Sequence, residues 1–232
     1  MNPSPPPQRW NEYFKDFIHS KWAWVFVACS LLFFVLAADI RYRGLIYRWD
    51  QTLTNYFHEL KTHEIFFFSW VTEFGGGSAR KLLWILLVPL FFSKRWYHAP
   101  GLLIAVLLGA EINSRMQGFW GRPRPGFDDL PPLTHPGFPS GHTANACFLY
   151  GYSALILWRE FATTKAFKIT VATIAAALIL AVGVSRMALL VHYTADVVGS
   201  YLWCTAWMIL CYWVNREAFK ASANRLNTWT KT

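Results

Sequence analysis

Long runs of apolar residues recur along this chain and constrain its fold more than any other feature. Of the 232 residues, 54% are hydrophobic and 15% are charged, against roughly 25% charged residues in an ordinary soluble domain. The first run, residues 22–38, meets the lower limit of about 17 residues for a helix that spans a bilayer. Later runs lie at residues 82–92, 100–112, 146–158, 167–184 and 197–214. Helices extend beyond such runs when their polar flanks face a shared site, so the sequence predicts an all-α, polytopic membrane bundle of about six transmembrane helices.

Amphipathic stretches accompany these runs. In residues 9–21, aromatic and apolar side chains recur at helical spacing between basic ones, which predicts an interfacial helix lying on the membrane. A second such pattern at residues 53–60 continues into the aromatic stretch 65–71, and three glycines at 75–77 then break the chain. The expected organisation is a tail and interfacial helix over 1–21, with the first eight residues disordered, a membrane-embedded domain over 22–214, and a cytoplasmic C-terminal tail over 215–232.

The Lys and Arg residues flank the apolar runs and form neither a patch nor a tail. The formal net charge of +9 therefore indicates positive flanks that orient helices and contact anionic headgroups, and no nucleic-acid partner is expected. With the N-terminus inside, twelve of the 22 Lys and Arg fall on the inner side. Four of the others, Arg115, Arg122, Arg124 and Arg186, have a separate explanation given below. We expect both termini in the cytoplasm and those stretches at the outer face.

Three short polar stretches stand where a membrane protein places polar residues only for a reason. They are Gly-Arg-Pro-Arg-Pro at 121–125, Pro-Ser-Gly-His at 139–142, and Ser-Arg-x5-His-x3-Asp at 185–196. Each has an ordinary interpretation by itself: a basic juxtamembrane loop, a turn with a helix cap, and a structural histidine near a helix end. Their common predicted face and complementary chemistry favour a single functional site.

The residue types in these stretches suit chemistry on a phosphate. On a helix, Asp196 and His192 share one face, so the carboxylate accepts one imidazole N–H and leaves the other nitrogen for attack. Arg124 and Arg186 are permanently charged planar donors that match phosphate oxygens.

The middle stretch supplies further donors to the same group. Ser140 offers a hydroxyl, and Gly141 offers a backbone N–H with close approach. A helix that starts near Ser140 adds attraction for an anion. His142 then lies near enough to donate a proton to a leaving oxygen.

Together the stretches resemble the signature of the type 2 phosphatidic-acid phosphatase superfamily, Lys-x6-Arg-Pro, Pro-Ser-Gly-His and Ser-Arg-x5-His-x3-Asp, and the second and third motifs match in full. The resemblance covers about residues 82–200 and implies a phosphohistidine formed on His192, with Asp196 orienting its ring. His142 would protonate the leaving group and then activate water. The implied phosphate-binding residues are Arg124, Ser140, Gly141 and Arg186.

The first motif departs from the family pattern. Counting back from Arg124 places Gln117 at the family's lysine position, whereas counting back from Arg122 places Arg115 there. We favour Gln117, whose neutral amide loses a charge-assisted contact of order 1 kcal/mol, although Arg115 swinging in would restore the charge. Both residues are therefore candidate phosphate ligands.

The family acts without a metal, and no cofactor is expected. The four cysteines, Cys29, Cys147, Cys204 and Cys211, lie inside apolar runs and lack metal-ligand spacing; they are predicted to be buried thiols. Asp128 and Asp129 are adjacent but stand in a Pro-rich loop, and a direct role for them is disfavoured.

The resemblance leaves the substrate open among an isoprenoid-carrier pyrophosphate, phosphatidylglycerol phosphate, phosphatidic acid and a glycolipid phosphate. Phosphotransfer to a second lipid is an alternative reaction, and a non-catalytic lipid-phosphate-binding protein is an alternative class. A soluble haloperoxidase-like protein is disfavoured by the apolar runs. The six-helix layout favours a bacterial inner membrane protein, and the sequence does not indicate an oligomeric state.

Overall fold

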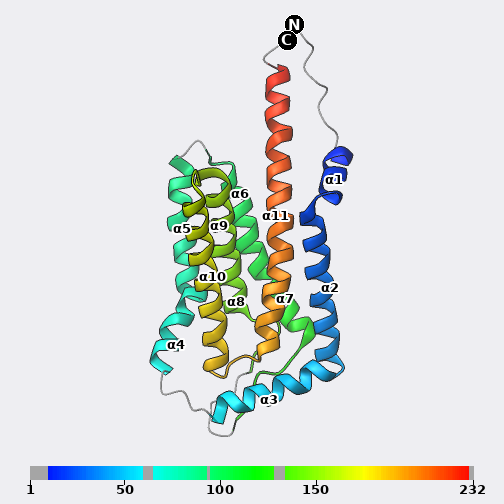
Figure 1. The fold of residues 1–232 in the computed structure, drawn as a ribbon, viewed down its shortest axis with the longest axis vertical. Helices are drawn as coiled ribbons and strands as arrows, with labels where there is room; N and C mark the ends of the chain where they lie inside the picture. Colours follow the sequence, from blue (N-terminus) through cyan, green and yellow to red (C-terminus); the bar gives the residue numbers. More distant parts are fainter. Residues whose placement is uncertain (1–9, 60–64, 93–94, 128–133, 230–232) are drawn as a thin grey trace.

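The computed structural model describes residues 10–59, 65–92, 95–127 and 134–229, and every regular element within them is helical (Figure 1). In chain order the helices are α1 (Trp10–Ile18), α2 (Lys21–Arg41), α3 (Leu45–Glu59), α4 (Ile65–Thr72), α5 (Gly77–Phe92), α6 (His98–Leu103), α7 (Gly109–Trp120), α8 (Gly141–Ala146), α9 (Tyr152–Ile156), α10 (Lys165–Ala188) and α11 (Thr194–Trp229). The predicted all-α class is confirmed. The disorder predicted for the first eight residues falls outside the described part of the chain.

Two columns of the bundle are built from shorter helices that follow one another without a break. A π-helical turn at Ile104–Leu108 joins α6 to α7, and another at Cys147–Gly151 joins α8 to α9, which a third at Leu157–Phe161 extends. The columns therefore cover residues 98–120 and 141–161. At about 1.5 Å per residue, each is roughly 30 Å long or more, which is the thickness of a bilayer core.

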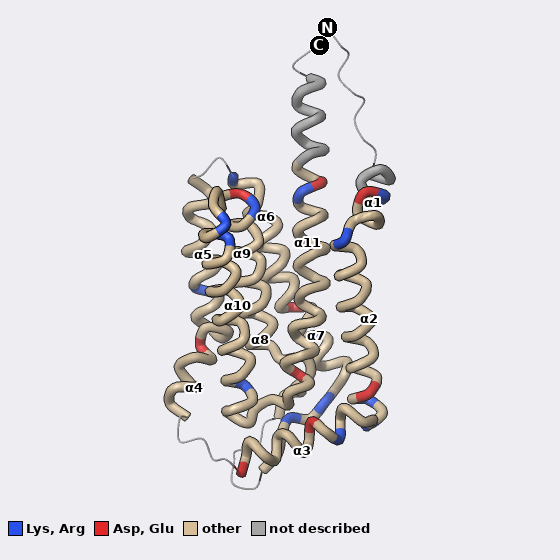
Figure 2. The backbone as a smooth tube through the Cα atoms, viewed as in Figure 1, with Lys and Arg blue, Asp and Glu red and all other residues tan. Residues whose placement is uncertain are grey.

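All six predicted apolar runs lie within helices. By length and apolar composition, Lys21–Arg41, Lys165–Ala188 and Thr194–Phe219 each qualify as a membrane span, and the pair Ile65–Ala79 and Lys81–Phe92, bent by 54°, would form a fourth. The two interrupted columns add the remaining candidates, so the count of six spanning helices stays a prediction. Figure 2 shows Lys, Arg, Asp and Glu gathered mainly toward the two ends of the bundle, with the middle largely free of them.

Helix α1 packs against the middle of α11. Phe17 of α1 lies 4.8 Å, centroid to centroid, from the ring of Trp213 in α11. Ser20 then caps α2 by accepting the N–H of Ala23, so the predicted interfacial helix ends where the first long helix begins. Helix α11 continues without a break to Trp229, through most of the segment expected as a C-terminal tail.

The column formed by α8 and α9 lies at the centre of the core. Phe148 and Tyr152 are fully buried there. Cys147 and Cys204 are buried as predicted, as is Cys211, while Cys29 is half-buried. Packing against neighbours on several sides fixes the start of this column, which carries the Pro-Ser-Gly-His motif.

The two ends of the bundle carry different parts of the chain. Helix α1 and the C-terminal end of α11 lie at one end, and α3 crosses the opposite end (Figure 1). At the α3 end, α7 finishes at Trp120, α8 begins at Gly141, and the turn from Ala188 to Thr194 joins α10 to α11. All three polar stretches therefore meet at this end.

The close approach of α10 and α11 near this end depends on Gly183. A Cβ at that position would overlap the hydroxyl of Tyr201 and lie 2.8 Å from Cγ1 of Val197. We expect Gly183→Ala to destabilise the fold by about 1–3 kcal/mol through overpacking, lowering the thermal midpoint in detergent by several degrees. Gly118→Ala is the matched control, since a Cβ there meets nothing within 4 Å. Equal midpoints for the two variants would contradict this packing analysis.

Candidate active site

His192 and Asp196 form a buried pair at the α3 end of the bundle. Nδ1 of His192 lies 3.2 Å from Oδ2 of Asp196, and the two side chains are 1% and 0% exposed. The prediction that both stand on one helical face is wrong, because α11 begins at Thr194 and His192 lies in the preceding turn. The contact itself is present.

The turn before α11 explains how the pair meets without a shared helix. Leu190 has a φ of 55°, a left-handed conformation costing roughly 1–2 kcal/mol for a residue with a side chain, which reverses the chain after α10. Oδ2 of Asp196 also accepts the N–H of Tyr193 at 3.1 Å. This is the contact that a third helical residue makes back to the N-cap in a capping box. The helix therefore starts after Tyr193, and His192 approaches the same carboxylate from outside it.

The second oxygen of Asp196 is held by an arginine whose role the sequence did not reveal. Nη1 of Arg122 donates to Oδ1 of Asp196 at 2.7 Å, and Nη2 donates to Oδ2 of Asp50 in α3, also at 2.7 Å. All three side chains are at most 3% exposed. Arg122 therefore bridges two buried carboxylates. Asp50 belongs to the site although no sequence motif includes it.

The remaining nitrogen of His192 is available for chemistry. Its Nε2 is buried and has no hydrogen-bond partner among the described residues. Burial, the largest cause, lowers the pKa of His192 to about 4; Asp196 opposes this shift, and Arg124 and Arg186 add to it. With Nδ1–H donated to Asp196, the neutral ring presents an unprotonated Nε2, which is what a nucleophile requires.

Arg124 and Arg186 bring positive charge to this nitrogen and have no carboxylate partner among the described residues. In that part of the chain, Arg124 donates to the backbone carbonyls of His135 at 2.9 Å and Val191 at 3.3 Å. Arg186 donates to the hydroxyl of Thr72 at 2.7 Å. Within the described ranges neither makes an ion pair, so their charge is left for an anionic ligand. Their roles as phosphate ligands stay a prediction.

The start of α8 adds backbone donors. The Ser140 N–H is used by the carbonyl of Asp196 at 3.1 Å, and the first helical bond runs from the Ala144 N–H to the Ser140 carbonyl. The N–H groups of Gly141 and His142 precede that bond and belong to the helix terminus, where anions are favoured. Ser140 is the N-cap, as expected, but its hydroxyl accepts from Thr143 at 3.1 Å.

His142 lies against the turn that joins α4 to α5. Its Nε2 would be 3.2 Å from a Cβ on Gly76, and its carbonyl would clash with one on Gly75. The glycines predicted to break the chain therefore let this turn pass close to the ring. Arg186 and His192 lie within electrostatic range of His142, which places it with the other site residues.

The two candidates for the family's lysine position lie differently. Gln117 faces the start of α8: its Nε2 donates to the Pro139 carbonyl at 2.7 Å and would be 3.7 Å from a Cβ on Gly141. Arg115 points away, is exposed, and pairs with Glu111 one turn earlier at 2.8 Å. The structure brings Gln117 to the site and leaves Arg115 outside it.

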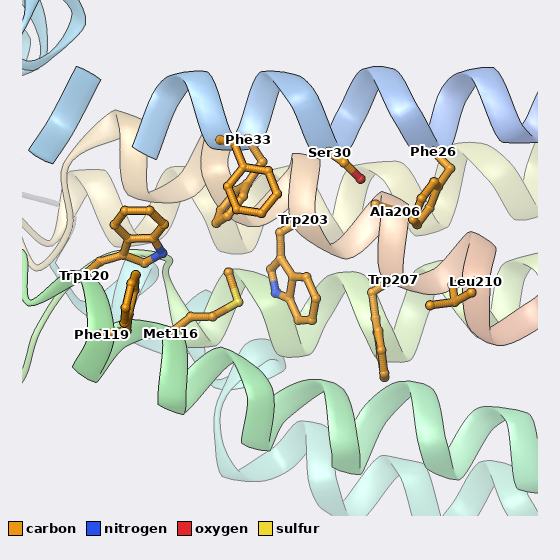
Figure 3. A pocket seen from close by; sticks show the side chains of 11 residues that line it. Phe26, Ser30, Phe33, Met116, Phe119, Trp120, Trp203, Ala206, Trp207 and Leu210 are labelled. Atoms are coloured by element: carbon orange, nitrogen blue, oxygen red, sulfur yellow. The ribbon is translucent and has the colours of Figure 1, made fainter. Parts of the chain in front are cut away.

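An apolar groove of about 370 Å³ runs between α2, α7 and α11 beside the site. Figure 3 shows side chains of all three helices pointing into it, among them Ser30 and Phe33 of α2, Trp120 of α7 and Trp203 of α11. Phe33 stacks on Phe138 with ring centroids 5.5 Å apart. Phe138 lies two residues before Ser140 in the sequence. The groove therefore ends next to the polar site.

Among the described residues, no group of three or more His, Cys, Asp or Glu is arranged to hold a metal ion. Asp128 and Asp129 lie outside the described residues, so their disfavoured role stays an expectation.

Comparison with known proteins fits this geometry. Residues 99–220 match the PAP2 superfamily, which is more than half of the chain, and the chain belongs to this family. The fold and site define an integral membrane phosphatase of the PAP2 type, an enzyme that acts on lipid phosphates.

Two further comparisons give the similarity of this chain to individual phosphatases. Phosphatidylglycerophosphatase B of Bacillus subtilis (strain 168) is 29% identical over 189 residues, covering 75% of this chain and 87% of the relative. The crystal structure of a transmembrane PAP2-type phosphatidylglycerolphosphate phosphatase from Bacillus subtilis has a TM-score of 0.73 at 25% identity, covering 81% of this chain and 94% of that one.

The lowered pKa of His192 can be measured directly. A group whose pKa is lowered stays neutral to lower pH, so we expect the ring to titrate near pH 4, not near the usual value of about 6.5. Nitrogen-15 NMR of histidine-labelled protein, with His192→Gln to assign the signal, would report this midpoint. A midpoint close to 6.5 would show that the ring is more solvated than the structure has it.

Proposed function

We propose that this chain hydrolyses the phosphate or pyrophosphate of a membrane lipid without a metal, through a phosphohistidine on His192. One observation carries the proposal. The buried Nε2 of His192 has no partner among the described residues, and it lies within electrostatic range of Arg124 and Arg186, which contact no carboxylate within the same described part of the chain. A phosphoryl group is the ligand that suits both features.

In the first step, the lone pair on His192 Nε2 forms a bond to phosphorus as the bond from phosphorus to the lipid oxygen breaks. Asp196 holds the ring through Nδ1 and stabilises the positive charge that develops on it. Arg124, Arg186 and the backbone donors at Gly141 face the phosphoryl oxygens as charge spreads over them. His142 gives a proton to the leaving oxygen.

In the second step, water attacks the phosphoryl group and the phosphorus–nitrogen bond breaks. His142, now unprotonated, takes a proton from the attacking water. Phosphate leaves, and the electron pair returns to His192 Nε2. Both histidines are then restored, so one site serves both halves of the reaction.

The groove beside the site supports a lipid as the leaving group. It is lined almost entirely by apolar and aromatic side chains, and one of them, Phe33, stacks on Phe138 near the donors of α8. We propose that it holds an acyl or isoprenoid chain while the phosphate reaches His192. Phosphatidylglycerol phosphate is the first candidate because both relatives are named for it. Phosphatidic acid, isoprenoid-carrier pyrophosphates and glycolipid phosphates present the same reactive group.

We also propose that the site opens at the outer face of the membrane. Helix α1 and the C-terminal end of α11 lie at the end of the bundle opposite the site (Figure 1). Of the positive residues predicted to stay inside, described ones such as Lys21 and Lys165 flank the helices at that end. A lipid phosphate of the outer leaflet would then meet the site directly.

Removal of the nucleophile tests the reaction. We expect His192→Ala to reduce phosphate release by at least about a thousandfold in protein that still folds, because Nε2 is the atom that bonds phosphorus. The assay uses purified protein in detergent, a panel of lipid phosphates and pyrophosphates, and a chelator throughout. Radiolabelled substrate should leave an acid-labile phosphoryl group on the wild type. Residual activity within tenfold of the wild type, or loss of activity on chelation, would overturn the mechanism.

Filling the groove tests the lipid site. We expect Ser30→Trp to raise KM for a long-chain lipid phosphate about tenfold, equivalent to roughly 1.4 kcal/mol of lost binding, because the indole occupies the space for the chain. A short-chain, water-soluble lipid phosphate should be hydrolysed as before. Val35→Trp, on the exposed face of α2, is the matched control. Equal effects on both chain lengths would argue against the groove as the lipid site.

A further inference from the structure

The buried ionic network behind the nucleophile extends beyond the residues of the family motifs. It runs from His192 through Asp196 and Arg122 to Asp50, with two Arg–carboxylate distances of 2.7 Å. Asp50 comes from α3, outside the matched range 99–220. Each member is at most 3% exposed, so water does not screen the interactions.

Arg122 is not free to bind a phosphate. One of its Nη atoms is engaged by Asp196 and the other by Asp50. Its guanidinium also packs over the ring of Tyr193, 4.2 Å from the centroid, with the ring of Tyr47 at 5.6 Å. The planar fork of an arginine suits two carboxylates held at a fixed angle. These contacts distinguish it from Arg124, which donates to two backbone carbonyls among the described residues.

Asp50 secures the other end of this arrangement. Its Oδ1 accepts the N–H of Ala195 at 3.0 Å, and its Oδ2 accepts Arg122. The carboxylate therefore holds both the arginine and the first turn of α11, one residue before Asp196. This side chain therefore connects α3 directly to the start of α11.

We propose that Asp50 and Arg122 are positioning residues that fix the carboxylate of Asp196 toward His192 Nδ1 and set its charge. Their effect on rate rests on the proposed phosphohistidine reaction. Their effect on the pKa of the His192 ring does not depend on that reaction, because it exists in the protein without substrate. Loss of Arg122 frees Asp196 to rotate and strengthens its negative field at His192. Loss of the Asp50 charge leaves the positive charge of Arg122 less compensated.

The two losses should therefore shift the titration of His192 in opposite directions. The titratable and charged groups that face the pair are Arg122 and Asp50 behind Asp196, with Arg124, Arg186 and His142 on the side of the ring. Arg122→Gln makes the environment more negative and stabilises the imidazolium, so the midpoint rises. Asp50→Asn makes it more positive, so the midpoint falls or the ring stays neutral to the lowest pH tested.

The experiment is the nitrogen-15 titration of His192 in full-length wild type, Arg122→Gln and Asp50→Asn. Arg48→Gln is the matched control, since Arg48 is an exposed residue of the same helix α3 whose side chain donates to the Gly44 carbonyl. We expect shifts of about half a pH unit or more, opposite in sign for the two variants, and none for the control. Shifts of the same sign, or no shift in a folded variant, would overturn the proposal.

Kinetics on the best lipid phosphate supply a second readout. We expect kcat to fall about 10–100-fold in both variants, as for other residues that orient a ligating or reacting group, with KM within about twofold. Arg122→Lys keeps the charge but loses the fork, so it should lower kcat while leaving the His192 midpoint near the wild-type value. If Arg122→Gln does not fold, Asp50→Asn, which is nearly the same shape, decides alone: an unchanged midpoint overturns the proposal. Absence of phosphatase activity in the wild type would instead count against the proposed function.

Discussion

The buried carboxylate of Asp196 is the interaction on which the rest of the site depends. An ionised carboxylate away from water costs several kcal/mol unless it is paired and hydrogen-bonded. Here its two oxygens accept from Arg122, His192 and the Tyr193 N–H, and its backbone carbonyl accepts the Ser140 N–H. The loop after α7, the start of α8 and the turn before α11 are thus fixed to one residue. The position of Asp196 therefore sets the positions of the proposed reacting groups.

The division of labour among three arginines follows from what surrounds each one. Arg122 is compensated by two carboxylates and serves the structure of the site. Arg124 and Arg186 donate to uncharged oxygens, so their charge remains available where the phosphoryl group is proposed to bind. The same residue type, repeated two positions apart in Arg-Pro-Arg-Pro, therefore performs two tasks, and the electrostatics of the partners decide which.

The bundle separates apolar from polar chemistry along its length. Its middle offers apolar surroundings and a groove between α2, α7 and α11, while its α3 end carries the ionic groups of the site. A lipid phosphate has the same division between chain and headgroup. The match explains why a membrane-embedded fold suits this substrate class: the chain stays in an apolar medium while the phosphate reaches a rigid, charged site.

The sequence by itself determined the helices and most of the candidate site residues, because apolar runs and short motifs are local signals. Every predicted run lies in a helix, and His142, Arg186 and Asp196 lie together as expected. Sequence spacing failed at His192, since it does not show that a capping contact starts α11 two residues later. It could not pair Arg122 with Asp50 or Asp196, which lie 72 and 74 residues away. Only the tertiary structure decided those partners, because an ion pair between distant segments is set by how the helices pack and not by any local pattern.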